Sequence, residues 1–137
     1  MGLTATAKGL TDETGYDCGY ITFGIYCREV AKAYNEEFGE IYEKWCKTAF
    51  TREPLTEDEC KRWNEICNDD LDIFLTHSDC DGKFTPQECR KIYNAMKGLK
   101  IDMQGHNYGV MKPYNMHEHW VAMFKHCADR RVNLYFH

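Results

Sequence analysis

Two matched helix starts constrain the fold of this chain more than any other feature of its sequence. Thr56 is followed three residues later by Glu59, and Thr85 is followed in the same way by Glu88. A threonine at the N-cap and a glutamate at the third helical position form a capping box, in which each side chain bonds the other residue's backbone N–H. Pro86 strengthens the second start, because the first helical position needs no N–H donor. Both segments are therefore predicted to begin helices.

Helical periodicity covers most of the remaining chain. Apolar side chains recur every three or four residues from 20 to 47, which is the period of one helix face, so we predict one helix there. Similar but shorter patterns predict helices after both capping boxes, a short helix around 71–75 and a last helix from about Asn115. The only strand signal is local, at Lys83 and Phe84. The predicted fold class is all-α.

The chain length and composition predict a single folded domain. A chain of 137 residues is of ordinary size for one domain. Its aromatic content of 14% is far from the composition of disordered segments. We expect a flexible N-terminal surface segment at 1–17, a helical core at 20–97, and a loop followed by a C-terminal helix at 98–137.

The cysteine count favours a disulfide-stapled domain. The chain has 8 cysteines, an even number, and this is typical of small secreted domains in an oxidising compartment. No two cysteines form a Cys-x-x-Cys pair, which argues against a zinc ribbon or a thioredoxin-type redox site. The spacing leaves the pairing open, and buried thiols in a cytosolic protein are the alternative. The candidates are Cys18, Cys27, Cys46, Cys60, Cys67, Cys80, Cys89 and Cys127.

Charge and hydropathy exclude several classes of partner. The chain has 22 acidic and 17 basic residues, a net charge of −5, which argues against binding to nucleic acid or to anionic membranes. No uncharged stretch approaches the ~20 residues of a membrane span, so none is expected. The polar N-terminus has no signal-peptide pattern, so a secreted protein would already have lost its signal peptide.

A loop with alternating acidic residues precedes the second capping box. Its chemistry-bearing residues are Asp79, Asp81, Gly82, Phe84 and Glu88. The segment at 77–88 resembles the loop of EF-hand calcium-binding proteins, which has oxygen ligands at positions 1, 3 and 5, glycine at 6, an apolar residue at 8 and glutamate at 12. These five residues match positions 3, 5, 6, 8 and 12.

The resemblance implies a calcium site at this loop. The implied ligands are His77, Asp79, Asp81, Lys83, Thr85 and Glu88. Lys83 would contribute its backbone oxygen, and Thr85 would bind directly or through a water. His77 stands where the family has a carboxylate, so the expected affinity is weak, about 10⁻⁴–10⁻³ M, and the ion would be structural rather than signalling.

A second segment resembles a degenerate copy of this loop. Residues 48–59 keep Leu55, Thr56 and Glu59 at the matching positions. Positions 3, 5 and 6 hold Phe50, Arg52 and Glu53, so two ligands and the glycine are missing. The resemblance implies a partner loop that binds no ion and that pairs with the short strand containing Phe84.

The leading functional prediction is a secreted calcium-binding protein that acts by binding a protein partner and not as an enzyme. An extracellular carrier is the alternative, because helix faces rich in aromatic residues can line a cavity for a small apolar ligand. The third is a small calcium-dependent hydrolase. Residues 15–19 are faintly similar to the calcium loop of secreted phospholipases A2, but the cysteine pair followed by His-Asp of that family is missing.

The histidines leave one further question open. The chain has 6, and three of them, His117, His119 and His126, lie in the predicted last helix. His117 and His119 point to opposite sides of a helix, and His126 is about 10 Å from His119 along the axis. A zinc or copper site would therefore need an irregular C-terminal segment.

Overall fold

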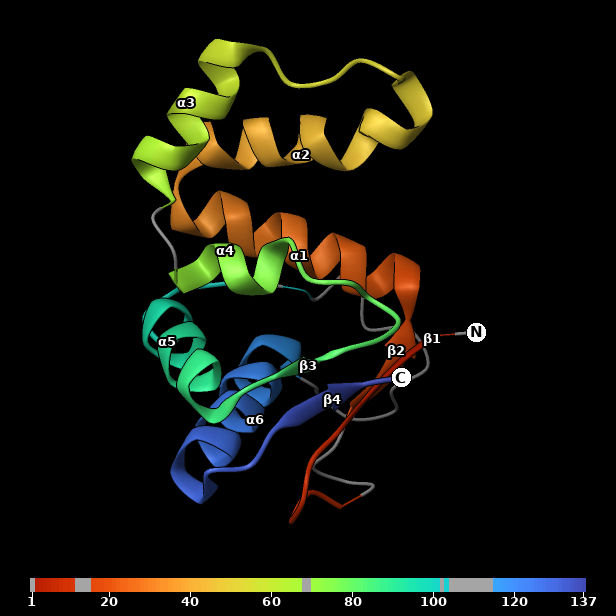
Figure 1. Cartoon of the computed structure of the whole chain (residues 1–137), viewed down its shortest axis with the longest axis vertical. Helices are drawn as coiled ribbons and strands as arrows, with labels where there is room; N and C mark the ends of the chain where they lie inside the picture. The colour runs from red at the N-terminus through yellow and green to blue at the C-terminus, as the bar shows by residue number, and fades with distance from the viewer. Residues whose placement is uncertain (1, 12–15, 68–69, 102, 104–114) are drawn as a thin grey trace.

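Helices make up most of the molecule, and a small sheet lies beside them (Figure 1). The computed structural model describes residues 2–11, 16–67, 70–101, 103 and 115–137. In Figure 1, α2 and α3 lie at one end, α5 and α6 toward the other, and α1 and α4 between them. The all-α prediction is correct for most of the chain, but it omits the sheet.

Most of the predicted helices are present close to their expected bounds. The described helices are α1 (Tyr20–Tyr34), α2 (Glu36–Thr51), α3 (Glu57–Ile66), α4 (Asp70–Leu75), α5 (Pro86–Met96) and α6 (Met116–Arg130). Complete capping boxes begin both α3 and α5, as predicted. The helix predicted from about Asn115 is also confirmed, and the Asn115 side chain accepts a hydrogen bond from the Glu118 N–H at 3.0 Å.

The single helix predicted over 20–47 is wrong, because the chain reverses at Asn35. This residue has an extended backbone, and its side chain accepts a hydrogen bond from the Phe38 N–H at 3.0 Å. Asparagine is among the best N-cap residues, so it starts α2 instead of continuing α1. The two helices then pack side by side. A Cβ atom at Gly39 would lie 2.8 Å from the Cα of Lys32, so the missing side chain permits this close approach.

The sheet has four antiparallel strands in the order β2-β1-β4-β3. The strands are β1 (Gly2–Thr6), β2 (Tyr16–Gly19), β3 (Lys83–Phe84) and β4 (Leu134–Phe136). The prediction of a flexible segment at 1–17 is wrong over β1, where Leu3 and Ala5 are fully buried. This strand lies inside the sheet, between β2 and β4. Its side chains are mostly small, so its sequence does not show the apolar pattern that predicts a strand.

An aromatic cluster at the centre connects the helices to the sheet. Trp120 of α6 is fully buried, and its ring centroid lies 5.4 Å from that of Phe23 and 5.6 Å from that of Phe74. Phe84 of β3 lies 5.6 Å from Phe124 and 5.2 Å from Phe136. These contacts anchor the loop that precedes α5, because rings from α4, α6 and β4 surround Phe84.

The described cysteines form no disulfide with one another, in contrast to the predicted staples. They are Cys27, Cys46, Cys60, Cys67, Cys80, Cys89 and Cys127. The side chain of Cys18 lies outside the described residues. Within the same described part of the chain, no helix has the length and apolar character needed to cross a membrane.

Candidate functional site

The second half of the loop at 77–88 is organised by a glycine turn, a short strand and a capped helix. Gly82 has a φ of +93°, in the left-handed region that glycine adopts without strain. β3 follows directly, and the Thr85 hydroxyl then accepts from the Glu88 N–H at 3.2 Å. One Glu88 carboxylate oxygen accepts from the Thr85 N–H at 2.9 Å. The loop therefore places Glu88 on the first turn of α5.

The His77 side chain packs inside this loop. Its ring centroid lies 4.1 Å from that of Phe84 and 5.3 Å from that of Phe136. A Cβ atom at Gly82 would be only 3.0 Å from the His77 ring, so the imidazole lies directly against the glycine turn. The ring Nδ1 lies 2.8 Å from the Ser78 carbonyl oxygen, to which it donates. The residue at loop position 1 thus supports the turn by packing.

The predicted ligands do not converge on one point. Asp79, Asp81 and Lys83 are exposed, and Glu88 bonds to the Thr85 backbone. Among the described residues, no three His, Cys, Asp or Glu side chains lie close enough together to hold a metal ion. A bound ion would therefore require the acidic side chains to rotate inward.

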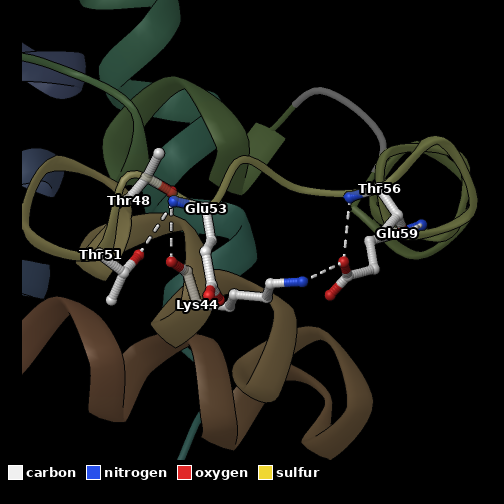
Figure 2. Close-up of polar contacts among 6 residues, drawn as sticks. All are labelled: Lys44, Thr48, Thr51, Glu53, Thr56 and Glu59. Carbon is white, nitrogen blue, oxygen red and sulfur yellow. Dashed lines mark hydrogen bonds and ion pairs between the residues drawn. The ribbon is translucent and has the colours of Figure 1, made fainter.

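The segment at 48–59 differs from an EF-hand loop at its helical start and in the contacts of its last glutamate, which Figure 2 shows. Helix α2 continues through Thr51, so the first four residues are helical. The Lys44 ammonium lies 2.6 Å from a Glu59 carboxylate oxygen, which also accepts from the Thr56 N–H at 3.0 Å. The hydrogen bond from Lys44 is the main reason that the pKa of Glu59 is lowered. A cationic side chain thus already bonds the carboxylate at position 12.

The predicted pairing between the two loops is wrong. β3 pairs with β4 instead, with Lys83 opposite Tyr135 and Phe84 opposite Leu134. The Phe136 N–H also donates to the Gly82 carbonyl oxygen at 3.0 Å. The C-terminal strand takes the place of a sister loop, because residues 48–51 are helical.

Comparison with known proteins adds nothing to this geometry. No family model, curated protein or solved structure matches the chain. The functional argument therefore rests on the chemistry of the described residues.

Sequence reasoning missed a second site, which is centred on His117. The Tyr26 hydroxyl and His117 Nδ1 are hydrogen-bonded at 2.8 Å, and both residues are buried. Burial lowers the pKa of His117, against the opposing effect of the nearby Leu99 and Met96 carbonyl groups. His117 also lines a pocket of about 520 Å³ between α5, residues 99–101 and α6. The partners are 91 residues apart, so no local pattern predicts their contact.

The other named histidines lie apart from one another. His126 Nε2 bonds the Lys8 carbonyl oxygen at 3.0 Å, and His137 Nε2 bonds the Thr6 hydroxyl at 2.9 Å. His119 is partly buried on α6, and His106 lies outside the described residues. The described histidines are thus distributed over different surfaces.

Two groups of the candidate disulfide cysteines do come together. Cys89 of α5 and Cys127 of α6 are both fully buried. A hydrogen bond with the Cys127 thiol, followed by burial, raises the pKa of Cys89. Burial raises the pKa of Tyr42 strongly, and hydrogen bonds between its hydroxyl and the thiols of Cys27 and Cys46 add to this effect. Cys60 and Cys80 are exposed.

Proposed function

We propose that the protein is a weak calcium-binding protein and that the ion binds at the loop of residues 77–88. The observation that carries the proposal is the left-handed Gly82, followed at once by β3 and by the capping-box start of α5. This order of turn, strand and helix puts a glutamate at the twelfth loop position on the first helical turn. A tight turn with a terminal glutamate is the arrangement that EF-hand calcium loops use.

Two of the ligands can reach the ion at little cost. Asp79 and Asp81 are exposed on a loop, so their carboxylates are free to turn inward. Glu88 has to release the Thr85 N–H, at a cost of about 1 kcal/mol for one hydrogen bond. His77 supplies no carboxylate, and its ring already fills part of the turn. These costs support a dissociation constant at the weak end of the range, about 10⁻⁴–10⁻³ M.

Such a site suits a structural role outside the cell. At an extracellular calcium concentration of about 10⁻³ M, a site of this affinity is half-filled or more, and binding stabilises the fold by about 0.4–1.4 kcal/mol. The ion would fix the connection between α4 and α5. We propose a secreted protein that acts by binding a partner and not by catalysis.

Calcium titration by calorimetry tests this proposal. We expect the wild-type protein to bind one ion at millimolar concentration and Glu88→Gln to lose that binding. Glu57→Gln is the matched control, since it removes an exposed first-turn glutamate from α3. His77→Asp should tighten binding at least tenfold, because it adds the missing carboxylate at position 1.

Two results would overturn the proposal. The first is the absence of any binding heat for the wild-type protein up to about 10 mM calcium. The second is equal affinity for the wild-type protein and Glu88→Gln, which would place the ion elsewhere. Far-ultraviolet circular dichroism of each variant separates loss of the site from loss of the fold.

A further inference from the structure

The pocket beside His117 has features of a ligand site that are independent of the calcium loop. It lies between the last turn of α5, residues 99–101 and the first half of α6, and its volume is about 520 Å³. That volume lies within the ~300–1,000 Å³ of small-molecule sites in proteins. We call it the α5–α6 pocket.

A buried polar residue contributes to the wall of this pocket. His117 is only 7% exposed, and its Nδ1 atom is hydrogen-bonded to the Tyr26 hydroxyl at 2.8 Å. The Leu99 and Met96 carbonyl groups also lie near its ring. The imidazole is therefore held in place by groups of this chain, and the charged residues around the pocket determine which ligand it favours.

The charge around the pocket favours an anionic ligand. Lys97, Lys100 and Lys125 all line it, and Glu118 is the acidic residue among its lining side chains. This local excess of positive charge lies on a chain whose net charge is −5. The amino-terminal end of α6 also lies at the pocket, and the helix dipole adds positive potential there.

The remaining wall is apolar. Leu99, Ile101 and Val121 contribute aliphatic side chains, and the Tyr93 ring stands beside them. The Lys97 ammonium lies 5.4 Å from the centroid of that ring, so the cationic and apolar parts of the wall are adjacent. A ligand that matches both parts needs an anionic head and a hydrocarbon body.

We propose that the α5–α6 pocket binds a small amphipathic carboxylate. The three lysines attract the negative charge of the carboxylate, and the hydrocarbon chain lies against the aliphatic wall. The proposal does not depend on calcium, since none of these residues belongs to the loop at 77–88.

Calorimetry with three probes of equal chain length tests the chemistry. The probes are sodium decanoate, decanol and decyltrimethylammonium bromide, each kept below its aggregation threshold in calcium-free buffer with a chelator. We expect decanoate to bind at least tenfold more tightly than decanol, and the cationic probe to bind most weakly. Equal binding of decanoate and decanol would overturn the anionic part of the proposal.

Two pairs of variants test the location. Ala122 lines the pocket and is exposed, so Ala122→Trp fills the cavity without entering the core, and decanoate affinity should fall at least tenfold. Ala33→Trp makes the same change on the exposed side of α1 and should leave affinity unchanged. Lys100→Glu should weaken binding at least threefold, whereas Lys61→Glu, on α3, should not. Unchanged affinity in both pocket variants, or no decanoate binding by the wild-type protein, would refute the site.

Discussion

Replacement of Gly39 by alanine should destabilise the protein, although the same change in a helix usually does the opposite. In an ordinary helix interior, alanine is favoured over glycine by about 0.5–1 kcal/mol. At Gly39, however, the new Cβ would lie 2.7 Å from Lys32 Cγ and 2.8 Å from Lys32 Cα. The second contact is with backbone and cannot be relieved by rotating a side chain, so α1 and α2 have to separate.

The magnitude follows from these two opposing terms. Overpacking costs about 1–3 kcal/mol, and a contact with backbone belongs in the upper part of that range, at about 2–3 kcal/mol, from which a gain in helix propensity of about 1 kcal/mol is subtracted. We expect Gly39→Ala to lower the free energy of unfolding by about 1–2 kcal/mol. Gly24 in α1 is the matched control, because the nearest atom to its added Cβ is Arg28 Nη1 at an ordinary 3.7 Å. Gly24→Ala should therefore raise the free energy of unfolding by about 0.5–1 kcal/mol.

Urea denaturation followed by tryptophan fluorescence and by far-ultraviolet circular dichroism measures both variants. Opposite shifts of the denaturation midpoint, with the slope unchanged, would support the close approach of α1 and α2. If both alanine variants stabilise the protein to a similar degree, the helices do not meet at Gly39 and the reasoning fails.

Two further predictions concern the buried histidine and the helix caps. Burial lowers the pKa of His117 from its ordinary value of 6.5, so the unfolded chain takes up this proton more readily than the folded protein. The free energy of unfolding should therefore decrease as the pH falls below about 6.5. Between pH 7 and pH 5, the urea midpoint should decrease less in His117→Gln than in the wild-type protein. An equal decrease in both proteins would contradict this prediction. Thr56→Ala and Thr85→Ala should each lower the free energy of unfolding by about 1 kcal/mol, because each removes a complete capping box. Thermal and urea unfolding measure this loss, and values near zero for both would show that the caps are not formed in solution.

Some of the candidate calcium loop was predictable from the sequence. The turn at Gly82 and the placement of Glu88 depend on contacts within a few residues, so the residue types were sufficient to predict them. The position of the His77 ring was not predictable, because it depends on Phe136, which the chain brings to the loop from its far end. The partner strand of β3 was mispredicted for the same reason.

The break at Asn35 shows a different limit. The apolar period continues across this residue, and periodicity alone therefore predicted one long helix. The N-cap hydrogen bond of Asn35 is a local signal that the periodicity concealed. Packing decides whether the chain continues as one helix or reverses at Asn35. Two antiparallel helices bury their apolar faces against each other, whereas one long helix would leave much of its apolar face in solvent.

What the sequence by itself determined is therefore the local structure: the capped starts of α3, α5 and α6, the short strand at Lys83 and Phe84, and the glycine turn before it. Each depends on hydrogen bonds or backbone preferences within about four residues. Only the tertiary structure decided the sheet around β1, the pairing of β3 with β4, and the pocket at His117. These features join residues that are distant along the chain, and burial of apolar surface, which has no preferred direction, brings them together.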